Sequence, residues 1–101
     1  MKETPPQKDL DTLVEHFKAG RFEKVEKIAI SLTKYYPNHA FGWKALAIAF
    51  KQNGKIIESL NANKKVIEIN PNDSEAYFNL ANTFKLLNKS NQAEINYKKA
   101  I

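Results

Sequence analysis

Hydrophobic residues recur along the chain with the spacing of helical faces. One such face, spaced i, i+3, i+4 and i+7, occurs within segment 40–53 and consists of Trp43, Leu46, Ala47 and Phe50. Segment 55–69 follows with a similar pattern, and Gly54 separates the two. This spacing predicts two amphipathic helices joined by a tight turn. Pro71 is expected to close the pair, because proline disfavours helical geometry in the residue before it.

Similar helix pairs are predicted on both sides of this central pair. Before it, apolar positions at helical spacing occur in 10–17 and 22–32, with Gly20 between them and Pro37 at the end. After it, 77–87 and 93–100 form two more faces around Asn88. Glycine and asparagine tolerate the left-handed backbone of a tight turn. Asp73 or Ser74 is expected to cap the fifth helix.

The three pairs are copies of one 34-residue unit. Positions 34 apart hold identical or similar residues, namely Pro37 and Pro71, Gly20, Gly54 and Asn88, Trp43 and Tyr77, Leu46 and Leu80, Ala47 and Ala81, and Phe50 and Phe84. A helix-turn-helix period of this length resembles the tetratricopeptide repeat (TPR). The resemblance implies an all-α superhelix of three repeats forming one domain over residues 1–101.

Repeat boundaries follow from the same spacing. The units are expected at about 6–39, 40–73 and 74–101, the last one truncated, after a flexible lead-in of residues 1–5. The fit is weaker in two places. Ser59 and Asn63 replace the usual alanine and aromatic residue of the second unit. The first helix of the first unit has polar residues at signature positions: Asp9, Thr12 and His16.

Composition narrows the function class. The chain has no cysteine, so thiolate metal sites and cysteine nucleophiles are excluded. No signal peptide, membrane span or known catalytic motif occurs in the sequence. We therefore expect a cytoplasmic, non-enzymatic protein without cofactor or metal. The net charge of +5 is spread over the three units, whereas nucleic-acid binders usually concentrate it on one face. Nucleic-acid binding through these lysines remains a third alternative.

Binding is expected on the concave face, which the first helices of the repeats line in TPR-like superhelices. The resemblance assigns ten residues to a site for a protein or peptide: Val14, Phe17, Phe41, Lys44, Ile48, Lys51, Phe78, Asn79, Asn82 and Lys85. Flanking lysines would suit an extended peptide or a helix with acidic residues. Lys44 and Asn79 also match two positions of a terminal-carboxylate clamp, although Ile48 stands where a second asparagine would be needed.

An alternative function comes from a second resemblance. Residues 71–101 are similar to the repeats that precede bacterial O-GlcNAc-transferase-like or sulfotransferase domains. It implies a region that positions substrates for a larger transferase, with Asn79 as one rung of an asparagine ladder and Asn82 one turn further on. The last helix also presents Ile95 and Ile101. We expect a fragment of a longer array, or a chain that covers this helix by self-association.

Overall fold

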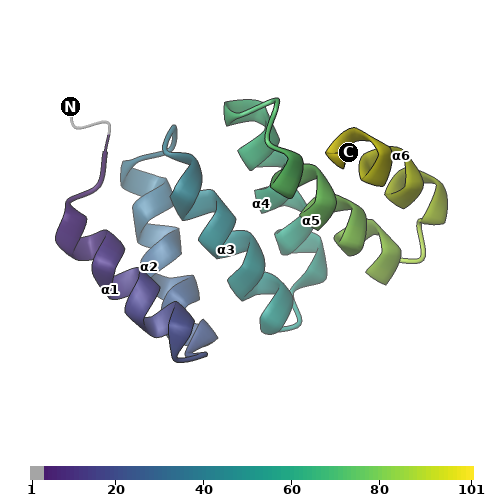
Figure 1. Cartoon of the computed structure of the whole chain (residues 1–101). Helices are drawn as coiled ribbons and strands as arrows, with labels where there is room; N and C mark the ends of the chain where they lie inside the picture. The colour runs from purple at the N-terminus through teal and green to yellow at the C-terminus, as the bar shows by residue number, and fades with distance from the viewer. Residues whose placement is uncertain (1–3) are drawn as a thin grey trace.

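The fold is a row of three antiparallel helix pairs (Figure 1). The computed structural model describes residues 4–101, so the first three residues of the expected lead-in lie outside the described part. Six helices follow one another in this part: α1 (Gln7–Lys18), α2 (Phe22–Tyr35), α3 (Ala40–Gln52), α4 (Ile56–Ile69), α5 (Ser74–Leu86) and α6 (Ser90–Ala100). No strand occurs between residues 4 and 101. The predicted all-α, helix-turn-helix fold is therefore confirmed.

Alternate helices form two layers. The helices α1, α3 and α5 lie in one row and run in the same direction, with α2, α4 and α6 behind them (Figure 1). The surface of this first row is called the inner face below. The molecule is elongated, with extents of 40 × 26 × 19 Å. Among the described residues, every helix is too short or too polar to cross a membrane.

The turns within the pairs have the predicted left-handed backbone. Gly20, Gly54 and Asn88 have φ angles of +74°, +80° and +59°. A Cβ atom built at either glycine would have no heavy atom within 4 Å. Glycine is therefore favoured at these two turns by the backbone angle and not by lack of space.

The repeat-equivalent residues Trp43 and Tyr77 join successive units. The indole Nε1–H of Trp43 donates to the carbonyl of Pro37 at 2.8 Å. The hydroxyl of Tyr77 donates to the carbonyl of Pro71 at 2.9 Å. Each proline carbonyl belongs to the loop that precedes the helix carrying the aromatic residue. An aromatic ring with a polar tip therefore both packs and fixes the path of that loop.

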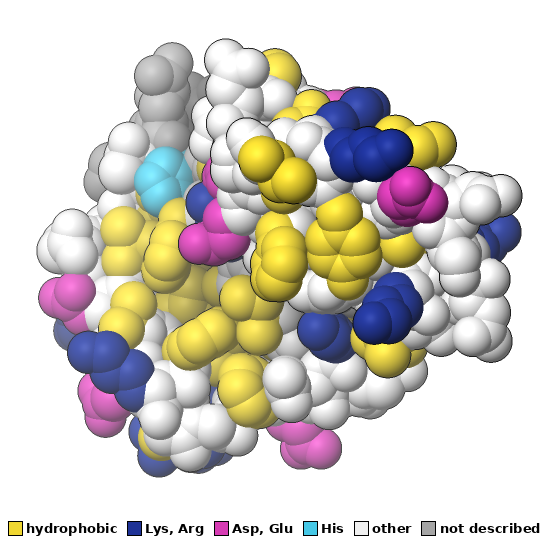
Figure 2. All heavy atoms as spheres, turned by 45° about the vertical axis from the view of Figure 1, so that its right-hand side comes forward, with side chains coloured by type: hydrophobic (Ala, Val, Ile, Leu, Met, Phe, Trp, Pro, Cys, Tyr) yellow, Lys and Arg dark blue, Asp and Glu magenta, His cyan; other side chains and the backbone are white. Residues whose placement is uncertain are grey.

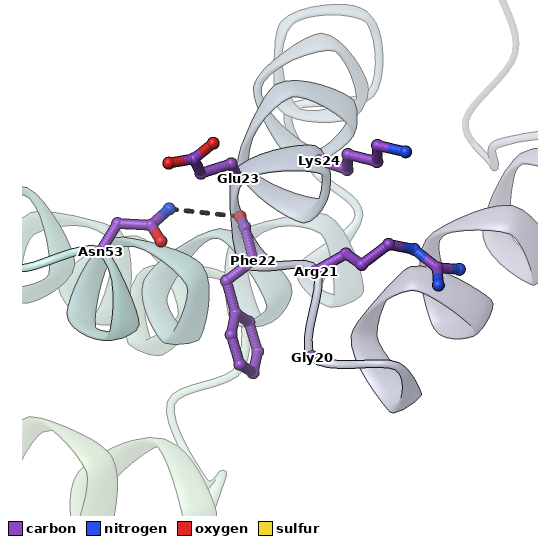
Figure 3. Close-up of a pocket in the computed structure, with 6 residues that line it drawn as sticks. All are labelled: Gly20, Arg21, Phe22, Glu23, Lys24 and Asn53. Carbon is purple, nitrogen blue, oxygen red and sulfur yellow. Dashed lines mark hydrogen bonds between the residues drawn. The ribbon is translucent and has the colours of Figure 1, made fainter.

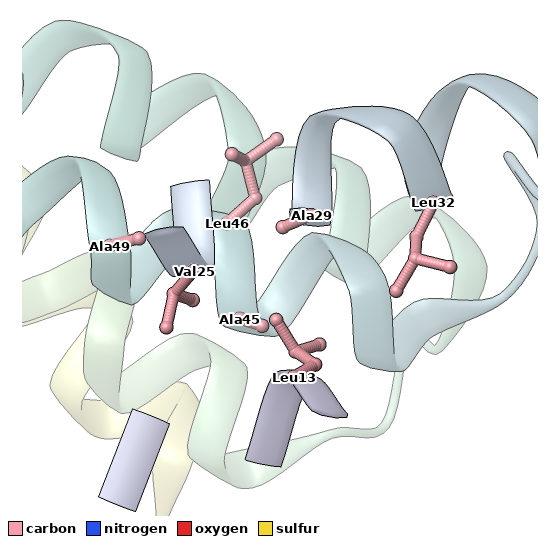
Figure 4. Packing of buried hydrophobic residues seen from close by; sticks show 7 residues of the cluster. All are labelled: Leu13, Val25, Ala29, Leu32, Ala45, Leu46 and Ala49. Atoms are coloured by element: carbon pink, nitrogen blue, oxygen red, sulfur yellow. The ribbon is translucent and has the colours of Figure 1, made fainter. Parts of the chain in front are cut away.

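The junction between the first and second units has an apolar core (Figure 4). Seven buried residues from α1, α2 and α3 form it: Leu13, Val25, Ala29, Leu32, Ala45, Leu46 and Ala49. Small side chains let the helices approach closely. At Gly42 of α3, a built Cβ would already stand 3.4 Å from the Cγ2 atom of Thr33 on α2. Burial of these apolar groups is the main stabilising term at this junction.

The second unit and its junction with the third contain buried polar side chains that are hydrogen-bonded. Ser59 is only 1% exposed, and its hydroxyl donates to the Ala47 carbonyl at 2.7 Å. The Nδ2 of Asn63 donates to the Thr83 hydroxyl at 3.4 Å, and that hydroxyl donates to the Asn79 carbonyl at 2.9 Å. The two residues that fitted the repeat pattern weakly therefore make hydrogen bonds, which removes most of the cost of burying them.

A polar contact at the turn end also links the first two units. The carboxylate of Glu26 on α2 accepts from Lys55 Nζ at 2.6 Å and from Asn53 Nδ2 at 2.9 Å. Asn53 also donates to the carbonyl of Phe22, as the dashed line in Figure 3 shows. The hydrogen bonds from Lys55 and Asn53 lower the pKa of Glu26, and Glu26 in turn raises the pKa of Lys55. Charge therefore reinforces this junction outside its apolar core.

Candidate inner-face binding site

A hollow of about 410 Å³ lies on the inner face between α1 and α3. Figure 2 shows hydrophobic side chains gathered around a hollow on this side of the molecule, with acidic and basic side chains at the border. We call the hollow the inner groove. Nine residues line it: Leu13, Val14, Phe17, Lys18, Phe41, Lys44, Ala45, Ile48 and Glu75.

Local sequence explains the depth of the inner groove. Val14 of α1 and Ile48 of α3 are repeat-equivalent, so they point to the same side of successive inner helices. Ala45 carries only a methyl group and is 4% exposed. A larger side chain at this position would fill the hollow. Phe41 leaves 39% of its surface exposed beside it, and an exposed aromatic side chain next to an apolar hollow is typical of binding surfaces.

Five of the ten predicted site residues meet in the inner groove. They are Val14, Phe17, Phe41, Lys44 and Ile48. The structure places the other five elsewhere. Lys51 lies in the last turn of α3, half-buried, and does not line the groove.

The predicted residues of α5 form a different surface. The ring of Phe78 meets that of Tyr97 edge-on, with ring centroids 5.7 Å apart. The Tyr97 hydroxyl donates to Oδ1 of Asn82, which fixes the orientation of that amide. Asn79 is half-buried one turn before Asn82. Lys85 borders a smaller hollow between α5 and α6. The predicted site is thus divided into an apolar part on α1 and α3 and an amide-rich part on α5.

Charges at the inner groove are largely compensated within the chain. Lys44 Nζ lies 2.5 Å from Asp73 Oδ2 and 4.0 Å from Glu75 Oε1. Asp73 also caps α5 by accepting from the Ala76 amide at 3.1 Å. Burial opposes ionisation of Asp73, but the hydrogen bonds from Lys44 and Ala76 outweigh it and lower the pKa of Asp73. A partner therefore meets Lys44 as half of an ion pair, not as a free positive charge.

The side chains around the other hollows do not converge on one point. One of about 360 Å³ lies at the start of α2, beside Asn53 (Figure 3). Among the charged side chains around it, Glu23 points to the side opposite Arg21 and Lys24 in Figure 3. Within residues 4–101, no three side chains of histidine, cysteine, aspartate or glutamate are grouped as metal ligands. His16 accepts a hydrogen bond from Arg21 Nε at 2.8 Å, a local contact at the end of α1.

The acidic partners of Lys44 leave no signal in the sequence pattern. Asp73 follows Lys44 by 29 residues and Glu75 by 31, which matches neither the helical spacing nor the 34-residue period. The cap signal at the start of α5 identified Asp73, but only as a cap. The ion pair arises because the start of α5 packs beside the first turns of α3.

Comparisons with known proteins agree with this architecture. Residues 62–95, one full period, match the tetratricopeptide repeat family. Among curated protein sequences, no significant match was found. Several solved structures are similar in fold at low sequence identity. MamA of MSR-1 has a TM-score of 0.85 at 14% identity, covering 91% of this chain and 53% of that one.

Two other similar structures contain a partner. A chain of the CopN–Scc3 complex gives a TM-score of 0.88 at 15% identity, with 93% of this chain and 55% of that chain covered. The second TPR of Spaghetti (RPAP3), bound to the HSP90 peptide SRMEEVD, gives a TM-score of 0.86 at 18% identity. The match covers 92% of this chain and 86% of that chain. The chain spans about half the length of the MamA structures that it matches. These similarities define the fold as a TPR-type helical solenoid.

Proposed function

We propose that this chain is a protein–protein interaction module that binds a segment of a partner protein in the inner groove. The observation that carries the proposal is the hollow of about 410 Å³, lined mainly by apolar side chains and bordered by the exposed ring of Phe41. Ligand sites are typically concave, mostly apolar and edged by a few polar groups. Two similar structures are named as the CopN–Scc3 complex and as Spaghetti bound to an HSP90 peptide, which supports binding of protein segments.

The predicted site residues have two roles in this proposal. Val14, Phe17, Phe41 and Ile48 contact the partner directly, and Lys44 shapes one end of the groove through its ion pair. The remaining five residues extend the surface beyond the groove: Lys51, Phe78, Asn79, Asn82 and Lys85. They are expected to tune affinity less than the groove does, because binding energy concentrates in desolvated pockets.

A displayed library of random 12-residue peptides, selected on the whole chain, tests the proposal. Selected peptides should bind Ile48→Glu at least about tenfold more weakly, because the carboxylate enters an apolar hollow. Phe41→Ala should weaken binding with less risk to folding. The matched control is Ile57→Glu on α4, because Ile57 is 55% exposed and does not line the groove. Equal affinity for wild type, Ile48→Glu and Phe41→Ala would contradict the inner groove as the site.

A second candidate is a substrate-positioning region of a larger transferase. Asn79 and Asn82 on α5 support it, because an amide can donate to one backbone group and accept from another. Tyr97 already occupies Oδ1 of Asn82, so its Nδ2 is the group left to donate. The parent reading frame tests this candidate directly. A frame that encodes no glycosyltransferase or sulfotransferase domain would exclude it.

Self-association through α6 is also proposed. Ile95 is 54% exposed, Ile101 is fully exposed, and a hollow of about 280 Å³ borders Ile101. Sedimentation of the 101-residue chain over a range of concentrations should show association that Ile95→Glu with Ile101→Ser removes. A monomer at the highest concentration would refute it.

A further inference from the structure

We propose that the occupant of the inner groove is an amphipathic α-helix of about three turns, lying antiparallel to α1 and α3. The inference rests on the proposed function and specifies the partner that the same site takes. Three features of the groove carry it: the scarcity of hydrogen-bonding groups, the arrangement of helices around it, and the placement of charge at its two ends.

The groove offers few partners to an extended backbone. Six of the nine lining side chains contain no hydrogen-bonding group, and Lys44 is already paired with Asp73. The backbone groups of α1 and α3 are bonded within their own helices. An extended segment would bring one N–H and one C=O per residue against this apolar surface, and each unpaired group is costly. A helix satisfies these groups internally and presents only side chains.

A helix also fits the geometry already present on the opposite side. α2 packs against both α1 and α3, with Val25 and Ala29 meeting Leu13 and Ala45 in one cluster. The direction of α2 is opposite to that of α1 and α3 (Figure 1). An antiparallel helix on the inner side would repeat this arrangement. The volume of about 410 Å³ is more than twice the ~150 Å³ of a cavity that accepts benzene, so two large apolar side chains one turn apart can enter it.

Charge gives the groove a direction. Lys18 lies in the last turn of α1 and lines the groove, and Lys51 lies in the last turn of α3. Glu75 lies in the first turn of α5 at the other end. Helices favour acidic residues in their first turn and basic residues in their last turn. An antiparallel occupant therefore places its acidic turn near the lysines and its basic turn near Glu75. From Phe41 to Lys51 a helix rises ~15 Å, which sets a length of about three turns.

A synthetic 14-residue peptide, acetylated and amidated, is the probe. It carries four leucines spaced i, i+3, i+4 and i+7, two glutamates in its first turn, two lysines in its last turn, and alanine or glutamine elsewhere. The control peptide has the same sequence except that proline replaces one central alanine. The probe should bind the whole chain, lose affinity for Ile48→Glu, and keep it for Ile57→Glu. The proline peptide should bind about 100-fold more weakly, because proline breaks the helix.

The direction is tested by pairing protein variants with probe variants. Lys18→Glu should weaken binding of the probe about two- to fivefold at low salt, which is the effect expected of an exposed charge pair. The loss should disappear when glutamine replaces the two glutamates of the probe, and persist when glutamine replaces its two lysines. Glu75→Lys should show the reverse dependence. Coupling of Lys18 to the lysine end would mean a parallel helix and would overturn the stated orientation.

The outcomes separate this inference from the proposed function. If library peptides bind through Ile48 while the helical probe does not, or while the proline peptide binds equally well, the interaction module stands and the helical occupant is overturned. If neither the library nor the probe yields binding that depends on Ile48 and Phe41, both proposals fail.

Discussion

The two junctions between repeats achieve the same packing with different chemistry. The first, around α3, buries Leu13, Val25 and Leu32 in an apolar cluster. The second, around α5, buries Asn63 and Thr83 as well as alanines. At both junctions, the next helix pair stacks beside the previous one in the same orientation (Figure 1). The repeat therefore needs filled volume at these positions, and it tolerates polar side chains there where each has a hydrogen-bond partner.

At the polar junction, removing one side chain of a buried hydrogen bond should destabilise the fold more than replacing both by apolar side chains. A buried amide left without its acceptor retains the full cost of desolvation, whereas an apolar pair of similar shape does not carry that cost. The apolar junction depends instead on volume alone. Substitutions that distinguish these two dependences therefore test the comparison most directly.

Truncation in the apolar junction should have the largest effect. Leu13 is fully buried, so Leu13→Ala should lower the free energy of unfolding by about 3 kcal/mol through lost burial and the remaining cavity. Urea denaturation measures the change. The matched control is Leu86→Ala, because that leucine is 54% exposed and should cost much less. Equal losses at the two positions would mean that Leu13 does not carry the core.

The polar junction should show coupling between its two side chains. Thr83→Val removes the hydroxyl that accepts from Asn63, and should cost about 1–2 kcal/mol because the amide loses its partner. The double variant Thr83→Val with Asn63→Leu should be less destabilised than the two single losses added together. Chemical denaturation of all four proteins gives this coupling energy. Strict additivity would show that the two side chains do not interact.

The smallest effect is expected where charge links α3 to α5. The folded pKa of Asp73 lies below its unfolded value, so this group stabilises the fold above pH ~4 and loses that contribution as the pH falls through the folded pKa. Asp73→Asn keeps the helix cap and should cost about 1 kcal/mol at pH 7, with a smaller difference from wild type at pH 2. Denaturation at both pH values measures it. Glu75→Gln is the control, because the Glu75 side chain is 68% exposed and its Oε1 atom lies 4.0 Å from Lys44 Nζ, farther than Asp73 does. A difference that persists undiminished at low pH would assign the effect to something other than charge.

Much of the fold could be predicted because its signals are local. Gly54 and Asn88 mark turns through their backbone preferences, and Trp43 and Tyr77 mark the start of a unit through their 34-residue spacing. Periodicity likewise brought Val14 and Ile48 to one face, and the structure finds them in one groove. Spacing along a helix fixes which face a side chain occupies, so these inferences needed no knowledge of packing.

The division of the candidate site could not be predicted in the same way. Asn82 and Tyr97 are 15 residues apart on different helices, and their hydrogen bond depends on how α6 packs against α5. The ion pair of Lys44 with Asp73 depends on the approach of α5 to α3. Neither pair is separated by the 34-residue period, because each joins two non-equivalent positions of the repeat.

The six helices and their turns could be predicted from the sequence, since each follows from spacing and from the backbone preferences of single residues. Which exposed side chains act together depended on how the helices pack in the folded chain. That packing placed the apolar hollow between α1 and α3, compensated Lys44 with Asp73, and turned the amides of α5 toward a separate surface. The physical reason is that a helical period fixes direction around one axis, whereas contact between side chains depends on how the axes pack against each other.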